Sequence, residues 1–308
     1  MMQTLLKPAP RACVRGVHIF RPVRNTAHMR TKWAAFLIFC AYVLALAALT
    51  APARAGAEDE RVSLPIVMYH HISADPARSG DYVITPATLE ADLEYLRDAG
   101  YTSVSAAQLT AWSRGEARLP EKPVMITFDD AQESFRTYAL PLLEEYGMCA
   151  VVAVVGQYAD EYTASGDTNA AYAYMSWDAI GEISASGRVE IASHTQAMHN
   201  AAGARRGCMI NPGEDEAEYF RALDADLAQV EASIERATGV RPTVFAFPFG
   251  FACGEAMQVL AQRGYTVAFT CDERVNRLSG VGAELMRLGR FNRPAGVGSE
   301  EFFAGWGS

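Results

Sequence analysis

Cysteine, histidine and positive charge are all scarce in this 308-residue sequence, and each scarcity narrows what the chain can be. Four of the six cysteines follow residue 55, and none of these has zinc-finger spacing, which argues against a zinc-finger module. Their disulfide pairing stays open, because four cysteines allow three connectivities; the four are Cys149, Cys208, Cys253 and Cys271. Internal repeats and low-complexity linkers are absent as well, which argues against a repeat architecture.

Acidic residues are missing from the first 55 positions, which hold eight basic residues. Residues 33–49 are almost wholly apolar, and Ala53-Arg54-Ala55 offers small residues at both cleavage-site positions. Together these features predict that residues 1–55 contain a secretory signal peptide. The alternative is an N-terminal membrane anchor through residues 33–50, because that stretch is long enough to span a bilayer. Either way we expect residues 56–308 to be the catalytic domain, secreted or held at the extracytoplasmic face of the membrane.

Positive charge is scarce in the rest of the chain. Without residues 1–55, 19 basic residues face all 36 acidic residues, a formal charge of −17. So acidic a body argues against nucleic acid or anionic lipid as the main partner. It fits a neutral or cationic substrate, and nothing in the sequence implies a protein partner.

Strand-like and helix-like segments alternate through the body. Several strands are nearly continuous apolar runs, which is typical of strands buried on both faces; the expected strands are 65–70, 101–104, 122–129, 150–156, 189–193, 243–247 and 266–270. Helices are expected at 133–146, where Pro141 kinks or restarts the helix, and at 214–238. Residues 158–174 and 201–212 are expected to be long loops. The alternation predicts a parallel α/β architecture, either barrel-like or doubly wound.

Polar residues gather where these strands end. His70, Asp129-Asp130, His194 and Pro248-Phe249 each follow an apolar run. Because the carboxyl ends of parallel strands meet at one face, we expect these residues to share a site. The histidines are concentrated there: four follow residue 55, in two clusters, and none follows His199.

His194 and His199 lie five residues apart, a spacing that does not match a helical zinc motif. They can share a metal only if His194 ends a strand and His199 returns on the following turn. The alternative is a pair of unrelated histidines, one packed and one exposed. The role of Asp129-Asp130 is open as well, because aspartate commonly caps a helix or lies in a turn. Two carboxylates at a strand end can also divide two roles, metal ligand and general base.

Four motifs, in order, resemble those of the polysaccharide deacetylases, carbohydrate esterases with a chitooligosaccharide-deacetylase-type domain. Thr127-Phe128-Asp129-Asp130 resembles their T-F-D-D motif, and His194-Thr195-x-x-x-His199 resembles the longer histidine motif of exported poly-N-acetylglucosamine deacetylases. Tyr69-His70-His71-Ile72 resembles the N-terminal Y-H motif of that branch, and Phe247-Pro248-Phe249-Gly250 resembles its proline-aromatic-glycine motif. The resemblance extends over most of the body of the chain.

The resemblance implies a (β/α) barrel, distorted or incomplete, with its active site at the carboxyl ends of the strands. It implies metal ligation, usually of Zn²⁺, by three residues: Asp130, His194 and His199. It further implies that Asp129 is the general base and His70 the general acid, with His71 structural. The backbone N–H of Phe249, next to Pro248, would help to hold the oxyanion. Apart from the resemblance, Tyr69 could stack on a sugar ring of the substrate, with ordinary packing as the alternative.

Two departures from the family pattern qualify these roles. Ala131 replaces the glycine that follows the aspartate pair, and the arginine that orients the base is missing ahead of Phe247. The candidates to replace that arginine are Asp272, Arg287, Arg290 and Arg293.

From the four motifs together we expect a metal-dependent hydrolase that removes N-acetyl groups from an extracellular or cell-wall polysaccharide. The alternatives are an O-acetyl esterase, a peptidoglycan deacetylase, or a glycan-binding protein that has lost turnover.

Overall fold

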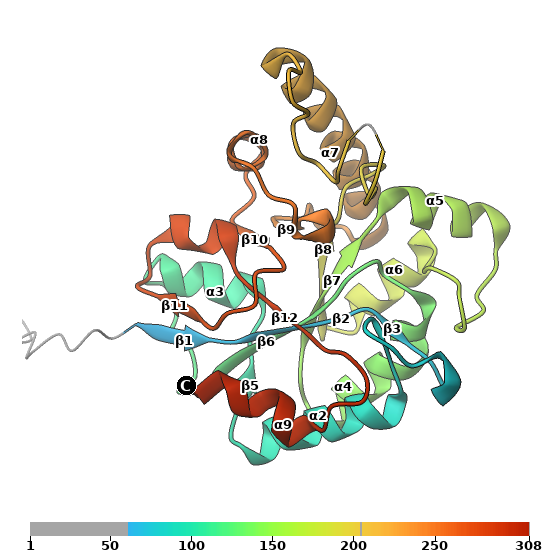
Figure 1. Ribbon diagram of the computed structural model, residues 1–308, viewed down its shortest axis with the longest axis vertical. Helices are drawn as coiled ribbons and strands as arrows, with labels where there is room; N and C mark the ends of the chain where they lie inside the picture. Colours follow the sequence, from blue (N-terminus) through green and yellow to red (C-terminus); the bar gives the residue numbers. More distant parts are fainter. Residues whose placement is uncertain (1–60, 204, 308) are drawn as a thin grey trace, which may run out of the picture. The chain divides into compact units, whose positions relative to one another are not determined.

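One strongly curved parallel sheet organises the structure (Figure 1). The computed structural model describes residues 61–203 and 205–307, so the expected signal peptide or anchor lies outside the described residues. Seven strands follow one another in the order β10-β9-β8-β7-β6-β2-β12, and β5 pairs with β6 as well. Their bounds are β2 (Ile66–Tyr69), β5 (Thr102–Ser103), β6 (Pro123–Phe128), β7 (Ala150–Val154), β8 (Val189–Ser193), β9 (Val244–Ala246), β10 (Val267–Phe269) and β12 (Phe291–Asn292).

The sheet curls into a barrel that is distorted and incomplete, as the sequence predicts. Strands β8 and β9 pair only at Ser193 and Phe245, so they separate towards their amino ends. On the other side, Leu288 pairs with β10 and the next residues, in β12, pair with β2. A short segment that carries Arg290 therefore bridges the two edges of the sheet.

Alternate strand residues build two apolar layers, as the two-residue period of a strand requires. In β6, Met125 packs inside the barrel, whereas Val124 and Ile126 pack outwards against the helices. Both sets are fully buried. This explains why the strands appear in the sequence as unbroken apolar runs.

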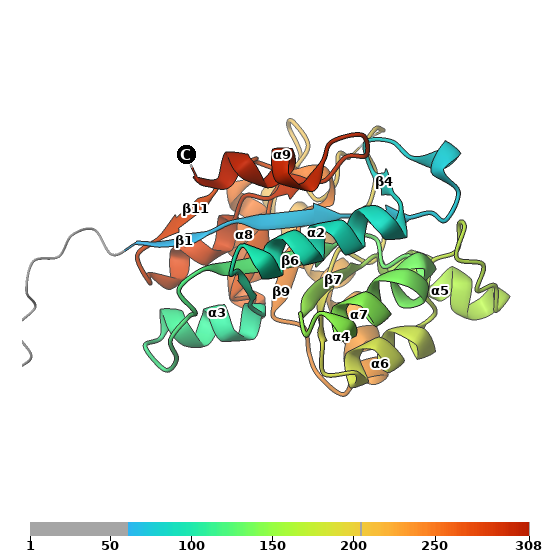
Figure 2. The same ribbon diagram turned by 90° about the horizontal axis from the view of Figure 1, so that it is seen from below.

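Helices surround the sheet, and the C-terminal helix α9 packs beside α2 (Figure 2). Their bounds are α2 (Pro86–Asp98), α3 (Ala106–Ser113), α4 (Leu140–Glu145), α5 (Gly156–Ser165), α6 (Trp177–Ala185), α7 (Glu216–Thr238), α8 (Gly254–Arg263) and α9 (Ser299–Ala304). Pro141 lies in the first turn of α4, after a π-helical turn, so it restarts the helix as predicted. The loop prediction for 158–174 is wrong over its first half, because α5 continues to Ser165.

Two small ladders flank the main sheet: β1 (Val62–Leu64) pairs with β11 (Asn276–Leu278), and β3 (His71–Ile72) pairs with β4 (Val83–Ile84). Among the residues that the structure describes, no helix has the length and apolar character needed to cross a bilayer. The four cysteines whose pairing the sequence left open are free thiols.

Candidate metal centre and active site

A cavity of about 800 Å³ opens at the carboxyl ends of the strands. It brings together most of the residues that the sequence singled out; those lining it are His70, His71, Asp129, Asp130, His194, His199 and Phe249. They come from the ends of four different strands, which is where a parallel barrel places its functional groups.

Three of these residues form a cluster that suits a divalent metal ion. Candidate ligand atoms of Asp130, His194 and His199 all lie within 4.8 Å of one another. The Oδ1 atom of Asp130 lies 3.3 Å from Nε2 of His199 and 3.7 Å from Nε2 of His194. That oxygen is buried and has no hydrogen-bond donor among the described residues. One carboxylate and two imidazoles fit Zn²⁺, and three protein ligands leave a position open for chemistry.

His194 is held in the tautomer that metal binding needs. Its Nδ1 atom lies 2.7 Å from the carbonyl oxygen of Ala246, so the ring donates there and leaves the lone pair on Nε2. Burial lowers the pKa of His194 to about 4, which keeps the imidazole neutral at physiological pH.

The turn after β8 shows how a five-residue spacing can bring two histidines together. Thr195 adopts a left-handed conformation with φ of 72°, which ends the strand direction at once. The carboxylate of Asp226, from α7, then accepts hydrogen bonds from the backbone N–H groups of Gln196 and Ala197, both at 2.8 Å. His199 therefore returns towards His194, and their ring centroids lie 4.9 Å apart.

Asp129 is held by Arg290, one of the four candidates to replace the missing motif arginine. The fully buried guanidinium donates to both carboxylate oxygens, at 2.7 and 2.8 Å. Burial opposes ionisation of Asp129, but Arg290 and the nearby imidazoles outweigh it, so its pKa lies well below the usual range. Asp129 is therefore an ionised carboxylate in a buried site.

The other three candidates for the missing arginine do not contact Asp129. Arg293 is fully buried but donates to Asp92 instead. Arg287 and Asp272 are both largely exposed and lie 3.5 Å from each other.

Asp130 titrates differently from its neighbour. Burial, reinforced by the charge of Asp129, raises the pKa of Asp130 to about 6. A bound cation would favour the ionised form, so metal binding and deprotonation are coupled at this residue.

Backbone strain is concentrated at this site. Among the described residues, four that are not glycine have positive φ: Asp130, Ala131, Thr195 and Phe249. Each lies in one of the motifs of the site, and such strain persists only where the surroundings enforce it. Ala131 has φ of 55°, so the position keeps the left-handed conformation that glycine adopts without cost.

His70 and His71 follow β2 and face the same cavity. Burial lowers the pKa of His70, although the carboxylates of Asp129 and Asp130 oppose the shift. Its ring meets Tyr82 edge-on, with centroids 4.9 Å apart. His71 is more buried, and its Nδ1 lies 3.1 Å from the hydroxyl of Ser134.

Phe249 contacts the carboxylate–imidazole cluster through its ring, and its backbone is strained, with φ of 57°. The ring is 39% exposed, and its centroid lies 4.5 Å from that of His199. Pro248, the preceding residue, is buried. The next residue must be glycine, because a Cβ atom at Gly250 would lie 2.6 Å from the backbone nitrogen of Cys271.

Of the two expectations for Tyr69, the structure agrees with ordinary packing, and contact with substrate is wrong. Its side chain is only 1% exposed and stacks on Phe128, so a sugar cannot reach it. Its hydroxyl instead donates to Asp92, which also pairs with Arg293. Tyr69 therefore fixes the end of β2 from inside the core.

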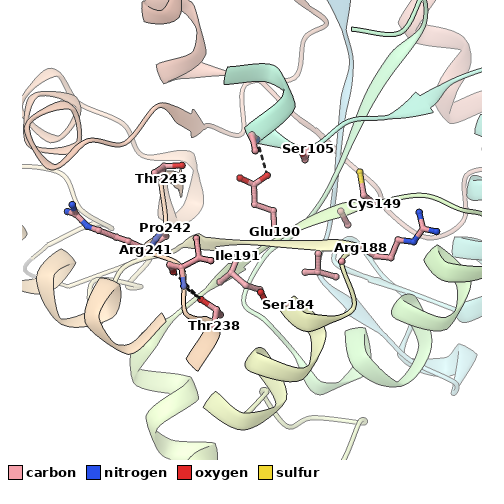
Figure 3. Close-up of a pocket in the computed structure, with 15 residues that line it drawn as sticks. Ser105, Cys149, Ser184, Arg188, Glu190, Ile191, Thr238, Arg241, Pro242 and Thr243 are labelled. Carbon is pink, nitrogen blue, oxygen red and sulfur yellow. Dashed lines mark hydrogen bonds between the residues drawn. The ribbon is translucent and has the colours of Figure 1, made fainter. Parts of the chain in front are cut away.

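A second hollow of about 310 Å³ lies at the opposite, amino ends of the strands and contains none of these residues (Figure 3). Residues 189–191 of β8 and residues 241–243, which precede β9, form part of its lining. Glu190 projects there, and its carboxylate accepts hydrogen bonds from the first backbone N–H groups of α3. This hollow is separate from the site.

The fold and the site define an α/β-barrel protein with a carboxylate–imidazole cluster at its mouth, and comparisons with known proteins show its family. A family model described as polysaccharide deacetylase matches residues 116–268. The poly-beta-1,6-N-acetyl-D-glucosamine N-deacetylase of Escherichia coli K12 is 31% identical over 224 residues, which cover 67% of this chain and 33% of that protein. This chain thus spans about a third of the length of that relative.

Two solved structures share the fold. A de-N-acetylase from Aggregatibacter actinomycetemcomitans aligns with a TM-score of 0.66 and 26% identity, over 77% of this chain and 97% of that one. IcaB from Ammonifex degensii aligns with a TM-score of 0.66 and 25% identity, over 79% and 96%. The chain belongs to the polysaccharide deacetylase family.

Proposed function

We propose that this protein is a metal-dependent hydrolase that removes N-acetyl groups from a polysaccharide containing N-acetylglucosamine. The observation that carries the proposal is the pairing, in one cavity, of an ionised buried carboxylate with a three-ligand metal cluster. The names of the relatives support the substrate class. The expected signal peptide or anchor supports an extracytoplasmic location.

The residues of the site have different roles in amide hydrolysis. Asp130, His194 and His199 would hold the ion, for which Zn²⁺ fits best. When bound, such a cation lowers the pKa of a water molecule to about 7 and polarises a carbonyl. Asp129 accepts a proton from the water that attacks the acetyl carbon, and Arg290 keeps this base ionised and oriented.

The remaining groups act on the acetyl oxygen and on the nitrogen of the breaking C–N bond. The backbone N–H of Phe249 stabilises the negative charge that develops on the acetyl oxygen. His70 donates a proton to the departing nitrogen, so acetate and a free amine are the products.

The glycan-binding alternative without turnover loses its support. That alternative depended on the missing arginine, and the contact of Arg290 with both carboxylate oxygens of Asp129 weighs against it. We therefore retain the hydrolytic function alone.

Acetate release is the direct test. The purified protein, supplied with Zn²⁺, is incubated with β-1,6-linked N-acetylglucosamine oligomers, peptidoglycan and an O-acetylated glycan. We expect release from the oligomers, a fall of at least about 10²-fold for Asp129→Asn, and near wild-type release for the surface control Asp272→Asn. Undiminished release by Asp129→Asn would contradict the proposed base, and release from the O-acetylated glycan alone would contradict the substrate class.

A further inference from the structure

The two histidines of the metal cluster are supported in different ways. His194 is 2% exposed and donates to a backbone carbonyl. That acceptor belongs to the main chain, so no side-chain substitution removes it. His199 is 15% exposed and lies on a loop rather than a strand. Its Nδ1 atom faces the hydroxyl of Tyr158 at 3.3 Å. The outer support of the more exposed ligand is therefore a single side chain.

Metal binding would determine which ring nitrogen of His199 carries the proton. Its Nε2 atom points to Asp130, 3.3 Å away, and can bind a cation only through a lone pair. The ring proton must then lie on Nδ1, where the Tyr158 oxygen accepts it.

Tyr158 is itself firmly placed relative to His199. It lies in the first turn of α5, whose first two backbone N–H groups donate to the carbonyls of Thr195 and Gln196, at 3.0 and 2.7 Å. Its ring also packs against Tyr174, with centroids 4.4 Å apart. The start of α5 and the histidine loop thus form one hydrogen-bonded unit.

We propose that Tyr158 is a positioning residue for the metal ligand His199 and that it raises the affinity of the site for a divalent cation. The proposal rests on the proposed function only in requiring that the cluster binds a metal. Partners of this kind fix the tautomer and the orientation of the imidazole, and their loss weakens metal binding by about 10–100-fold.

The test is a Zn²⁺ titration of the full chain against a chromogenic chelator, with Tyr158→Phe as the variant. Phenylalanine keeps the ring that packs on Tyr174 and removes only the acceptor. The matched control is Tyr162→Phe, one helical turn further along α5, which also packs near Tyr174. We expect the Zn²⁺ Kd to rise about 10–100-fold for Tyr158→Phe and to stay within about twofold for the control.

Acetate release at saturating Zn²⁺ separates positioning from catalysis. We expect Tyr158→Phe to recover release close to that of the wild type once the site is filled. A Kd equal to that of Tyr162→Phe would overturn the proposal while leaving the proposed function intact. Failure of the wild type to bind Zn²⁺ would overturn both.

Discussion

Replacing Arg290 with glutamine tests how the proposed base is held. The guanidinium is fully buried and bonds both oxygens of Asp129. Removing one partner of a buried ion pair costs about 3–5 kcal/mol, because the remaining charge is left unpaired in a medium that solvates it poorly. We expect the free energy of unfolding of Arg290→Gln to fall by about this amount at pH 7 in the metal-free protein.

The sign of the pH dependence should reverse between the two proteins. In the wild type the pKa of Asp129 lies below its unfolded value of about 3.9, so its stabilising contribution is present above that pH and is lost on acidification. In Arg290→Gln the guanidinium no longer opposes the effect of burial, so we expect the pKa of Asp129 to rise above the unfolded value and stability to be lost as the pH rises. The difference in stability should therefore be largest at neutral pH and narrow towards about pH 4.

Urea unfolding followed by circular dichroism, with a chelator present, measures both effects. The double variant Arg290→Gln/Asp129→Asn should be more stable than Arg290→Gln at pH 7, because it buries no unpaired charge. Arg293→Gln is the matched control: it breaks a similar buried pair, with Asp92, and should not couple to Asp129→Asn. Two results would contradict the predicted role of Arg290. One is a free energy of unfolding for Arg290→Gln within about 0.5 kcal/mol of the wild type at pH 7. The other is a double variant no more stable than Arg290→Gln.

Three further outcomes follow from the contacts. Asp226→Ala removes the acceptor for two backbone N–H groups of the histidine loop, so the Zn²⁺ Kd should rise about tenfold or more; an unchanged Kd in the same titration would exclude that role. Tyr69→Phe should cost about 1 kcal/mol in thermal unfolding and leave the KM for oligomers unchanged, because the ring is buried; a raised KM would place it at the substrate. His70→Ala should slow acetate release about 10²–10⁴-fold while the Zn²⁺ Kd stays within about twofold; unchanged release would remove it as the acid.

The strands were predictable from the sequence because burial on both faces leaves continuous apolar runs. The start of α5 was not predictable, because this helix begins at Gly156 without a side-chain cap. The closure of the sheet was also hidden: β12 is two residues long and pairs with a strand more than 200 residues earlier, which no local periodicity reveals.

The site, like the fold, was only partly predictable from the sequence. Motifs at strand ends brought His70, Asp129 and Asp130 into one prediction, because parallel strands share a carboxyl face. Arg290 was one of four candidates. Which of them reaches Asp129 depends on how the segment around residues 288–292 crosses from β10 to the edge strand β2. Asp226 gave no signal, since it is one of many acidic residues on α7.

Reconstitution of metal-stripped protein tests the central claim most directly. The protein is treated with a chelator, Zn²⁺ is returned in measured equivalents, and acetate release from β-1,6-linked N-acetylglucosamine oligomers is followed. We expect no release without metal, a rise that saturates at about one equivalent for a single three-ligand site, and no response from Asp130→Ala. Full release by the stripped protein, or the same response from Asp130→Ala, would contradict the proposed metal dependence.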